Sequence, residues 1–153
     1  MSRKNCFVKI SGDMFSDDVL NWIKKLSQEY FVVVCVGCGT QINEMFVKAG
    51  LPVGKFGPLG RENVNLKEKQ LARDVLEKNQ AEIQDRLVGL GVHASVVIPV
   101  IEVGTVLCHV NGDQFILAVY HGFDVLYVVT TKDRVEKKKS FFASYNKIQV
   151  IGF

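Results

Sequence analysis

The sequence lacks any apolar run long enough to cross a membrane. Its longest run, Phe31–Val36, is far shorter than the roughly 20 residues that a membrane-spanning helix needs. The first residues, Met1–Asn5, lead directly into a strand-like segment and not into the apolar stretch of a signal peptide. We therefore expect a protein without a membrane partner and with a cytoplasmic location.

A strong charge of either sign is also missing. The 19 basic and 16 acidic side chains leave a net charge of +3, which is too weak to indicate nucleic-acid binding. Hydrophobic residues make up 48% and charged residues 23% of the chain, which is typical of globular and not of disordered proteins. Internal repeats, low-complexity tracts and linkers are absent, so we predict a single domain over residues 1–153.

Cysteine and histidine do not gather at the spacing of a metal site. Cys35 and Cys38 form a Cys-x-x-Cys pair, but Cys35 lies inside a strand-like run, whereas a redox pair belongs at a helix N-terminus. The second Cys/His pair of a zinc site is missing. We predict no metal site, and a redox or zinc role is the weaker alternative. The three histidines are expected to serve packing or the surface: His93, His109 and His121.

Several well-known signatures are absent as well. A Walker P-loop needs Gly-x4-Gly-Lys followed by Ser or Thr, but Gly50–Phe56 has the wrong spacing and no hydroxyl after its lysine. A dinucleotide-binding fingerprint needs a third glycine where Ile42 stands. The motifs Gly-x-Ser-x-Gly and His-Glu-x-x-His do not occur either.

What the sequence does contain is a regular alternation of strand-like and helix-like segments. Apolar and β-branched runs predict strands at Cys6–Ile10, Phe31–Val36, His93–Val100, Gly104–Val110, Val125–Thr130 and Lys147–Ile151. Apolar residues at helical spacing predict helices after Ser16, after Thr40, over Leu66–Leu87, after Asn111 and over about Asp133–Ser144. This order favours an α/β fold with a mainly parallel sheet between helices, a three-layer αβα sandwich.

Two parts of this pattern have a possible functional meaning. Leu51–Val64 is rich in glycine and proline and is predicted to be an irregular loop, the longest in the chain; such loops are often functional. Asn79 interrupts the apolar stripe of the longest helix. It is either a buried amide bonded to a neighbouring carbonyl or a polar group that faces a ligand cleft.

Three turns after strand-like runs have the composition of phosphate-binding sites: Lys9–Gly12, Gly37–Thr40 and Asn111–Asp113. Glycine lets a phosphate approach the backbone because no Cβ intervenes, and a helix start offers unpaired N–H groups and a positive dipole end. Ligands of parallel sheets bind beyond the carboxyl ends of the strands. We therefore expect the three turns to converge on one cleft suited to phosphoryl transfer, with Lys9 and Asp113 together in it.

These segments together resemble the amino-acid kinase superfamily, which includes acetylglutamate, glutamate, aspartate, uridylate and isopentenyl-phosphate kinases. In that family a first strand ends in Lys-x-Gly/Ser-Gly and a second in a glycine triplet. A Val-Asn-Gly-Asp-like turn opens a middle helix, and a later strand ends in a Thr-Asp-Val-Asp-Gly-Val-like turn. The matching segments here are Lys9–Gly12, Gly37–Asn43, Val110–Asp113 and Thr130–Val135. They occur in the family's order, and the resemblance implies the carbamate-kinase-like form of the αβα fold.

The sequence departs from the family pattern at three positions and in length. Cys38 stands in the glycine triplet, Thr131 replaces the first aspartate of the later turn, and Arg134 replaces its glycine. Twenty residues follow Asp133, where the family continues with further strands and a second catalytic lysine. The resemblance therefore implies an intact acceptor half and a reduced nucleotide-binding C-terminal part.

The resemblance also implies catalytic and phosphate-binding roles. Lys9 would neutralise the transferring phosphoryl group, and Asp113 would hold Lys9 by a charge-assisted hydrogen bond. The turns would cradle phosphate oxygens, chiefly through backbone N–H groups; the residues concerned are Ser11, Gly12, Gly37, Cys38 and Gly39.

Further roles concern the two substrates. Arg61 would clamp an acidic group of the acceptor, since a guanidinium matches carboxylate or phosphate. Asn111 would touch the phosphate acceptor, and Thr130 and Asp133 would border the nucleotide. The run Lys137–Lys139 is expected to be a solvated helix face from which one lysine can reach a nucleotide.

Each role has a plain structural alternative. Lys9 can be a strand-end lysine that reaches water, and the glycines can serve only tight turns. Asp113 can be only a helix cap. For Arg61 the two interpretations are evenly balanced, since loop arginines are common.

The function implied by the resemblance is transfer of the ATP γ-phosphoryl group, with Mg²⁺ bridging the phosphates, to a small carboxylate or phosphate acceptor. Two alternatives stay open. The chain can bind a nucleotide or small anion without turnover, as a sensor or regulator, or it can complete a larger assembly. The family commonly forms dimers or hexamers, so we expect a homo-oligomer in which the Leu66–Leu87 helix can contribute to the contact.

Overall fold

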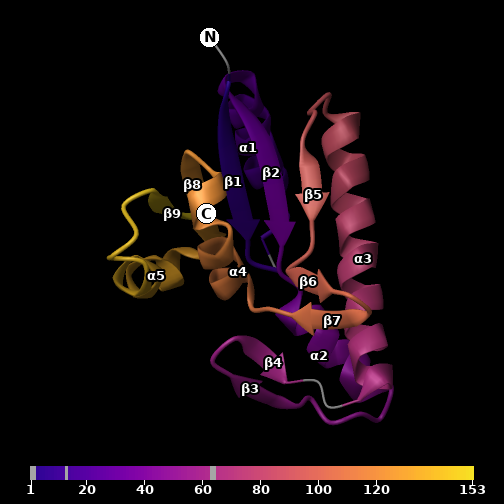
Figure 1. Ribbon diagram of the computed structural model, residues 1–153. Helices are drawn as coiled ribbons and strands as arrows, with labels where there is room; N and C mark the ends of the chain where they lie inside the picture. Colours follow the sequence, from indigo (N-terminus) through magenta and orange to yellow (C-terminus); the bar gives the residue numbers. More distant parts are fainter. Residues whose placement is uncertain (1–2, 13, 63–64) are drawn as a thin grey trace.

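The computed structural model describes residues 3–12, 14–62 and 65–153 (Figure 1). Its centre is a parallel sheet of five strands in the order β5-β2-β1-β8-β9. The strands are β1 (Lys4–Ile10), β2 (Tyr30–Val36), β5 (Ser95–Val97), β8 (Val125–Thr130) and β9 (Ile148–Gly152). The mixed α/β fold with a parallel sheet is therefore confirmed, and its kinase-like form stays a prediction.

The side chains of β1 alternate between the two faces of the sheet. Cys6, Val8 and Ile10 join the larger hydrophobic core on one face, whereas Phe7 joins a smaller core on the other. Because successive strand residues point to opposite faces, Lys9 shares the face of Phe7. This alternation places a lysine at the carboxyl end of the sheet on the side of the smaller core.

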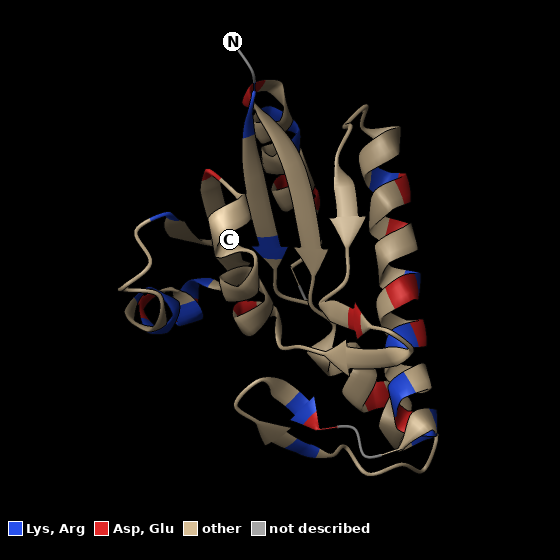
Figure 2. Ribbon diagram, in the orientation of Figure 1, with Lys and Arg blue, Asp and Glu red and all other residues tan. Residues whose placement is uncertain are grey.

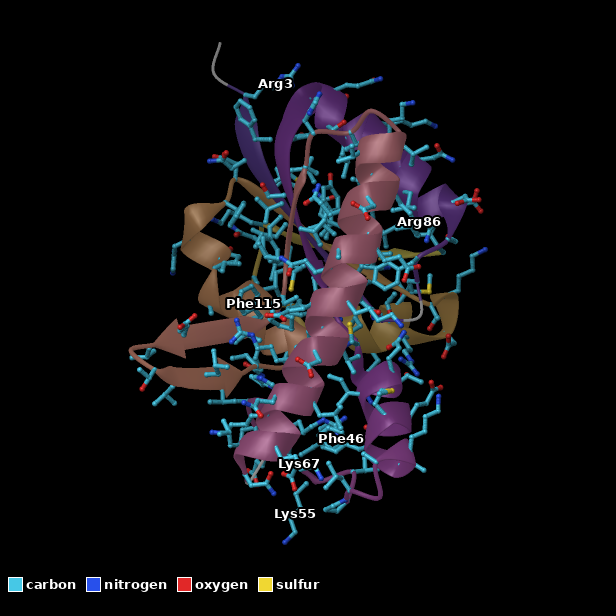
Figure 3. The ribbon with its side chains drawn as sticks, turned by 90° about the vertical axis from the view of Figure 1, so that its right-hand side faces the viewer. Arg3, Phe46, Lys55, Lys67, Arg86 and Phe115 are labelled. Carbon is cyan, nitrogen blue, oxygen red and sulfur yellow. The ribbon has the colours of Figure 1, made fainter. Side chains whose placement is uncertain are left out.

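Three helices cover the face of the larger core: α1 (Asp17–Glu29), α2 (Gly39–Lys48) and α3 (Leu66–Gly89). Ser16 and Asn65 cap the starts of α1 and α3 by accepting backbone N–H bonds, as these residue types usually do. Arg86 joins the two helices, because its guanidinium donates to the Phe15 carbonyl and contacts Asp17 at 2.9 Å. Figure 3 shows Arg86 and Lys67 near opposite ends of the long α3 helix.

Shorter helices pack on the other face over β1, β8 and β9. They are α4 (Gly112–Ala118), the 3₁₀ turns η1 (Tyr120–Gly122) and η2 (Lys132–Arg134), and α5 (Val135–Phe141). The Phe7 ring lies 6.2 Å from the ring of Phe115 and 5.0 Å from that of Phe123. Ile116 of α4 and Phe142, just after α5, complete this core. The packing fixes the first turn of α4 beside the end of β1.

Two antiparallel hairpins lie outside the main sheet, and both correct expectations from the sequence. The segment Leu51–Val64 is not simply irregular, because it contains β3 (Lys55–Gly57) paired with β4 (Gly60–Glu62); residues 63–64 lie outside the described part. The expected strands His93–Val100 and Gly104–Val110 do not both join the sheet. Ser95–Val97 does, whereas β6 (Val100–Val103) and β7 (Val106–His109) pair with each other.

The strand order reverses next to β1. Strands β1, β2 and β5 follow one another toward one edge, and β8 and β9 extend the sheet from the other side of β1. Ligands of such sheets bind beyond the carboxyl ends of the strands at the reversal. In Figure 1 these ends of β1 and β2 point toward the two hairpins. Within the described residues, no helix is both long and apolar enough to cross a membrane.

Candidate functional site

A cavity of about 270 Å³ opens at the carboxyl ends of β1 and β2. The structure brings nine of the eleven residues singled out from the sequence to its wall: Lys9, Ser11, Gly12, Gly37, Cys38, Gly39, Arg61, Asn111 and Asp113. The expected convergence of the three turns is therefore found. One premise of this expectation was wrong, because Asn111–Asp113 follows β7 of a hairpin and not a strand of the main sheet.

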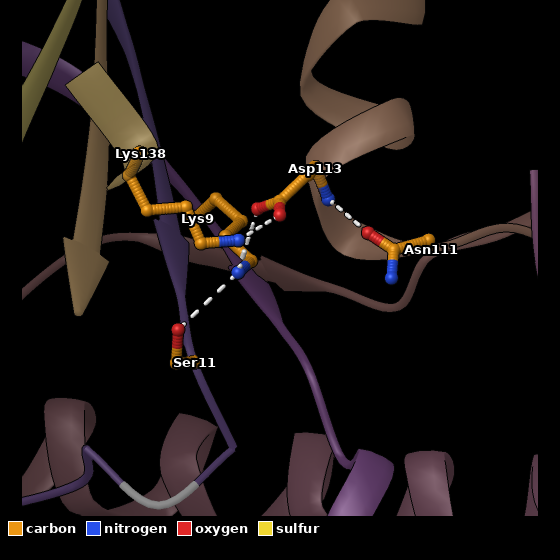
Figure 4. A network of polar contacts seen from close by, with 5 residues as sticks. All are labelled: Lys9, Ser11, Asn111, Asp113 and Lys138. Carbon is orange, nitrogen blue, oxygen red and sulfur yellow. Dashed lines mark hydrogen bonds and ion pairs between the residues drawn. The ribbon is translucent and has the colours of Figure 1, made fainter. Parts of the chain in front are cut away.

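Lys9 is the buried cation of this cavity. Its side chain is only 8% exposed, and its Nζ lies 3.0 Å from Asp113 Oδ1 and donates to Ser11 Oγ at 3.3 Å (Figure 4). Burial lowers the pKa of Lys9, and the Asp113 carboxylate offsets only part of this effect. The alternative of a strand-end lysine that reaches water does not hold, because the ammonium points into the protein.

Asp113 lies between two lysines. Lys138 of α5 donates to Asp113 Oδ2, while Lys9 contacts Oδ1 (Figure 4). Burial acts to raise the pKa of Asp113, but the two ammonium groups outweigh it, so the pKa of this carboxyl lies below its usual value of 3.8. Asp113 is therefore an anion that orients two cations, and the helix N-cap is Asn111, whose Oδ1 accepts the Asp113 N–H at 2.8 Å.

Two glycines make this arrangement sterically possible. A Cβ on Gly112 would lie 2.7 Å from Lys9 Cε, so a larger residue there would force the lysine stem to move from its place beneath α4. A Cβ on Gly12 would lie 2.5 Å from the Gly37 carbonyl oxygen, so glycine lets the turns after β1 and β2 touch. Gly39 has open space at its Cβ position, which leaves the cavity accessible at the start of α2.

The backbone donors of the cavity differ in part from those expected. Ser11 N–H donates to the Val129 carbonyl at 3.1 Å, and Gly37 N–H donates to the Ile10 carbonyl at 3.0 Å. The expectation that these two N–H groups cradle phosphate was therefore wrong, because the sheet and its turn already use them. Gly12 and Gly39 N–H have no acceptor among the described residues, and Gly39 begins the ten-residue helix α2. These two N–H groups are the backbone donors that we retain for an anion.

Arg61 forms a second cationic point at the hairpin side of the cavity. Its guanidinium donates to the Val53 carbonyl and to Asn43 Oδ1, and its Cζ lies 5.2 Å and 4.8 Å from the ring centroids of Phe46 and Phe56. No carboxylate of a described residue pairs with it. Since a guanidinium has five N–H donors, Arg61 keeps some of them for a ligand.

The wall near Arg61 is largely apolar. Phe56, Ala72, Leu76 and Pro99 line it together with His109. Burial lowers the pKa of His109, and nearby Lys69, Arg73 and Arg61 add to the effect. His109 is therefore neutral near pH 7, and this part of the cavity offers a small apolar surface beside a guanidinium.

Two singled-out residues do not line the cavity. Thr130 ends β8 with no exposed surface, and its hydroxyl makes no hydrogen bond to a described residue. Asp133 is exposed in η2, and its interaction with the Thr131 side chain lowers the pKa of its carboxyl below the usual value. Their expected contact with a nucleotide stays a prediction.

Sequence reasoning left two cations of the cavity unassigned. Lys138 is the member of the Lys137–Lys139 run that turns inward, and Arg134 lines the cavity from the start of α5. A run of three lysines signals a charged helix but does not reveal which member points inward. At Arg134 the sequence showed only a departure from the family's glycine.

The polar interruption in α3 also has a structural explanation. Asn79 donates to the Cys38 sulfur at 3.0 Å, so it bonds a thiol and not the carbonyl that one alternative predicted. The four cysteines form no disulfide bond within the described part of the chain. Burial raises the pKa of Cys6 and of Cys35 to about 12, which keeps both in the unreactive thiol form.

Comparison with models of known protein families finds no match, and a search of curated proteins finds no match either.

Proposed function

We propose that this cavity binds the phosphates of a nucleoside triphosphate such as ATP and transfers the γ-phosphoryl group to a small carboxylate or phosphate acceptor, as an amino-acid-kinase-like enzyme. The supporting observation is the buried Lys9 ammonium, which Asp113 holds at 3.0 Å beside the glycine turns. A fixed ammonium in a site with little water neutralises the charge of a transferring phosphoryl group far better than in bulk water.

The charge state of Asp113 favours an acceptor that is already an anion. Asp113 is the one carboxylate among the described residues that line the cavity, and two lysines engage it. It is therefore a poor general base for a hydroxyl acceptor. A carboxylate or phosphate needs no base, and Arg61 at the hairpin side would hold its acidic group while Asn111 contacts the reacting end.

The described residues do not form a cage for Mg²⁺. They include no group of three or more histidine, cysteine or acidic side chains placed to hold a metal ion, and the lysines already occupy Asp113. Mg²⁺ commonly binds through substrate phosphates with few protein ligands. In this proposal Mg²⁺ binds to the phosphates of the nucleotide, and the roles of Lys9 and Asp113 involve no direct contact with the ion.

A second candidate is a regulator that binds a nucleotide or anion without turnover. The N–H groups of Ser11 and Gly37 are already bonded within the protein, so fewer fixed donors remain to stabilise a transition state. This observation favours binding without turnover. A third is a subunit of a larger assembly, which would not bind nucleotide at all.

Calorimetric titration with Mg-ATP, followed by an ADP-release assay with a panel of small carboxylates and phosphates, separates these candidates. ATP binding with acceptor-dependent ADP release, lost in Lys9→Met, supports the enzyme. Binding without ADP release under any acceptor supports the regulator. If neither ATP nor inorganic phosphate binds, the proposal that the cavity binds phosphate is wrong and the assembly role gains support. Gly39→Ala adds a probe of the cavity, since its Cβ meets nothing in the free protein and would reduce only ligand binding.

A further inference from the structure

A second pair of cations lines the cavity in addition to Lys9 and Arg61. Lys138 and Arg134 both come from the segment that follows β8, and both line the cavity. Lys138 is 20% exposed in its side chain and touches the same carboxylate as Lys9. Lys9 and two backbone N–H groups can hold one phosphate without this second pair of cations.

The cavity holds more positive charge than a single phosphate needs. Four cationic side chains line it, Lys9, Arg61, Arg134 and Lys138, against the single described carboxylate of Asp113, a formal surplus of three positive charges. Arg61 and Arg134 make no ion pair with a described carboxylate. Surplus charge in a partly enclosed site attracts anions that carry several charges.

The space and the wall suit a phosphate chain better than a whole nucleoside. The cavity of about 270 Å³ lies below the roughly 300–1,000 Å³ of sites that enclose drug-sized ligands. Its polar wall includes four cations and the N–H groups of Gly12 and Gly39, which match phosphate oxygens. Thr130 and Asp133, the residues expected beside the nucleotide, lie outside it.

We infer that the cavity recognises its phosphate donor through the phosphate chain, with Lys138 and Arg134 adding to Lys9 as cationic contacts of that chain, and that the base and sugar contribute little. This inference rests on the proposed phosphate-binding function. It makes nucleoside triphosphates with different bases, and inorganic tripolyphosphate, equivalent ligands of one site.

Competition calorimetry on the wild-type chain with ATP, GTP, CTP, sodium tripolyphosphate and adenosine tests the inference. We expect the affinities of the three nucleotides to lie within about threefold of one another, and tripolyphosphate to bind within about tenfold of ATP. A single strong contact to the base or sugar would already give a roughly tenfold difference in affinity. Adenosine should not bind at millimolar concentration. A preference for ATP over GTP and CTP above about tenfold, or competition by adenosine, overturns the inference.

Variants of the second cation pair give an independent test. Lys138→Gln and Arg134→Gln should each weaken tripolyphosphate binding about tenfold, the value of one charge-assisted hydrogen bond, and weaken orthophosphate much less. Lys137→Gln, on the exposed side of the same helix, is the matched control and should stay within about twofold. Glutamine keeps a neutral N–H donor at each position, and melting curves check that each variant folds. Equal losses in Lys137→Gln and Lys138→Gln overturn the inference.

The outcomes separate this inference from the proposed reaction. Base-indifferent binding without ADP release supports phosphate-chain recognition and contradicts phosphoryl transfer. ADP release with a strong preference for one base supports transfer and overturns the inference. If neither tripolyphosphate nor ATP binds, both are wrong.

Discussion

Lys9 is the residue on which the proposed chemistry depends most directly. Lys9→Met keeps the length of the side chain and removes its charge, and Asp113 retains Lys138 as a partner, so the fold should persist. We expect the barrier to phosphoryl transfer to rise by about 3–4 kcal/mol, the value of one preorganised electrostatic contact. Initial rates of ADP release measure it. Lys4→Met, on the exposed start of the same strand, is the control and should match the wild type.

Asp113 gives the fold a pH dependence with a defined sign. Its pKa is lower in the folded chain than the ordinary 3.8, so its carboxylate stabilises the fold above that value, and the contribution disappears as the pH falls through the folded-state pKa. At pH 7, Asp113→Asn should cost about 3 kcal/mol, because it leaves two lysines without their shared anion. Urea unfolding from pH 7 to pH 2 should show the wild-type and variant curves converging in acid. A gap that stays constant over this range would contradict the assignment.

The sequence indicated the residues of the cavity better than their bonds. Lys9 and Asp113 were expected to meet because both belong to turns at strand ends, and they lie 3.0 Å apart. The hydrogen bonds of Ser11 and Gly37 were not foreseeable, because they depend on how the turn after β1 fits against β2 and β8. The partner of Asn79 depends on which neighbouring helix start faces α3, and a stripe pattern does not contain that information.

Among the elements, the long helices and buried strands were predictable and the hairpins were not. Helix α3 was expected at Leu66–Leu87 and spans Leu66–Gly89, because its apolar spacing and its Gly89 end are local signals. Strands β3 and β4 have three residues each, too few for an alternating pattern. The β6–β7 turn did carry a signal, Gly104 at the first position of a two-residue hairpin loop, but the apolar strands beside it resembled sheet strands.

The β3–β4 hairpin is held against the cavity by one close backbone approach. Gly60 has φ +129°, a Cβ there would lie 2.6 Å from Asn111 N, and Asn111 N–H donates to the Leu59 carbonyl at 2.7 Å. Gly60→Ala should therefore separate the hairpin from the Asn111 turn. We expect a stability loss of about 2–3 kcal/mol, since backbone strain and a steric clash add, together with weaker binding of acidic acceptors because Arg61 moves.

Gly104→Ala is the matched control for this hairpin. Gly104 also has a positive φ, +61°, but its Cβ would meet nothing within 4 Å. It should cost only the strain of a left-handed residue, about 1 kcal/mol, and leave ligand binding unchanged. Thermal unfolding and calorimetry compare the two variants. Equal losses of stability and affinity in both would show that the contact with Asn111 has no special role.

At the level of the whole molecule, topology explains why distant segments meet. The strand order reverses between β1 and β8, so the chain departs from the centre of the sheet in both directions and leaves a gap at the ends of the central strands. The cavity lies at these strand ends, and it is bordered by the turn after β1, the start of α2, the Asn111 turn and α5. Figure 2 shows basic and acidic residues interleaved along α3, so that long surface is balanced in charge, unlike the cavity.

The surplus of three positive charges at the cavity implies that ligand binding weakens as the ionic strength rises. The four cations that line the cavity attract a polyanion from solution, and salt screens such attraction beyond about 8–10 Å at 0.1–0.15 M. Raising NaCl from 50 to 300 mM should weaken tripolyphosphate binding about tenfold, and Lys138→Gln should flatten this dependence because one of the attracting charges is gone. Titration calorimetry at several salt concentrations measures both slopes. Lys137→Gln keeps the wild-type slope if the attraction is local to the cavity, and a flattening as large as that of Lys138→Gln would show that only the overall charge matters.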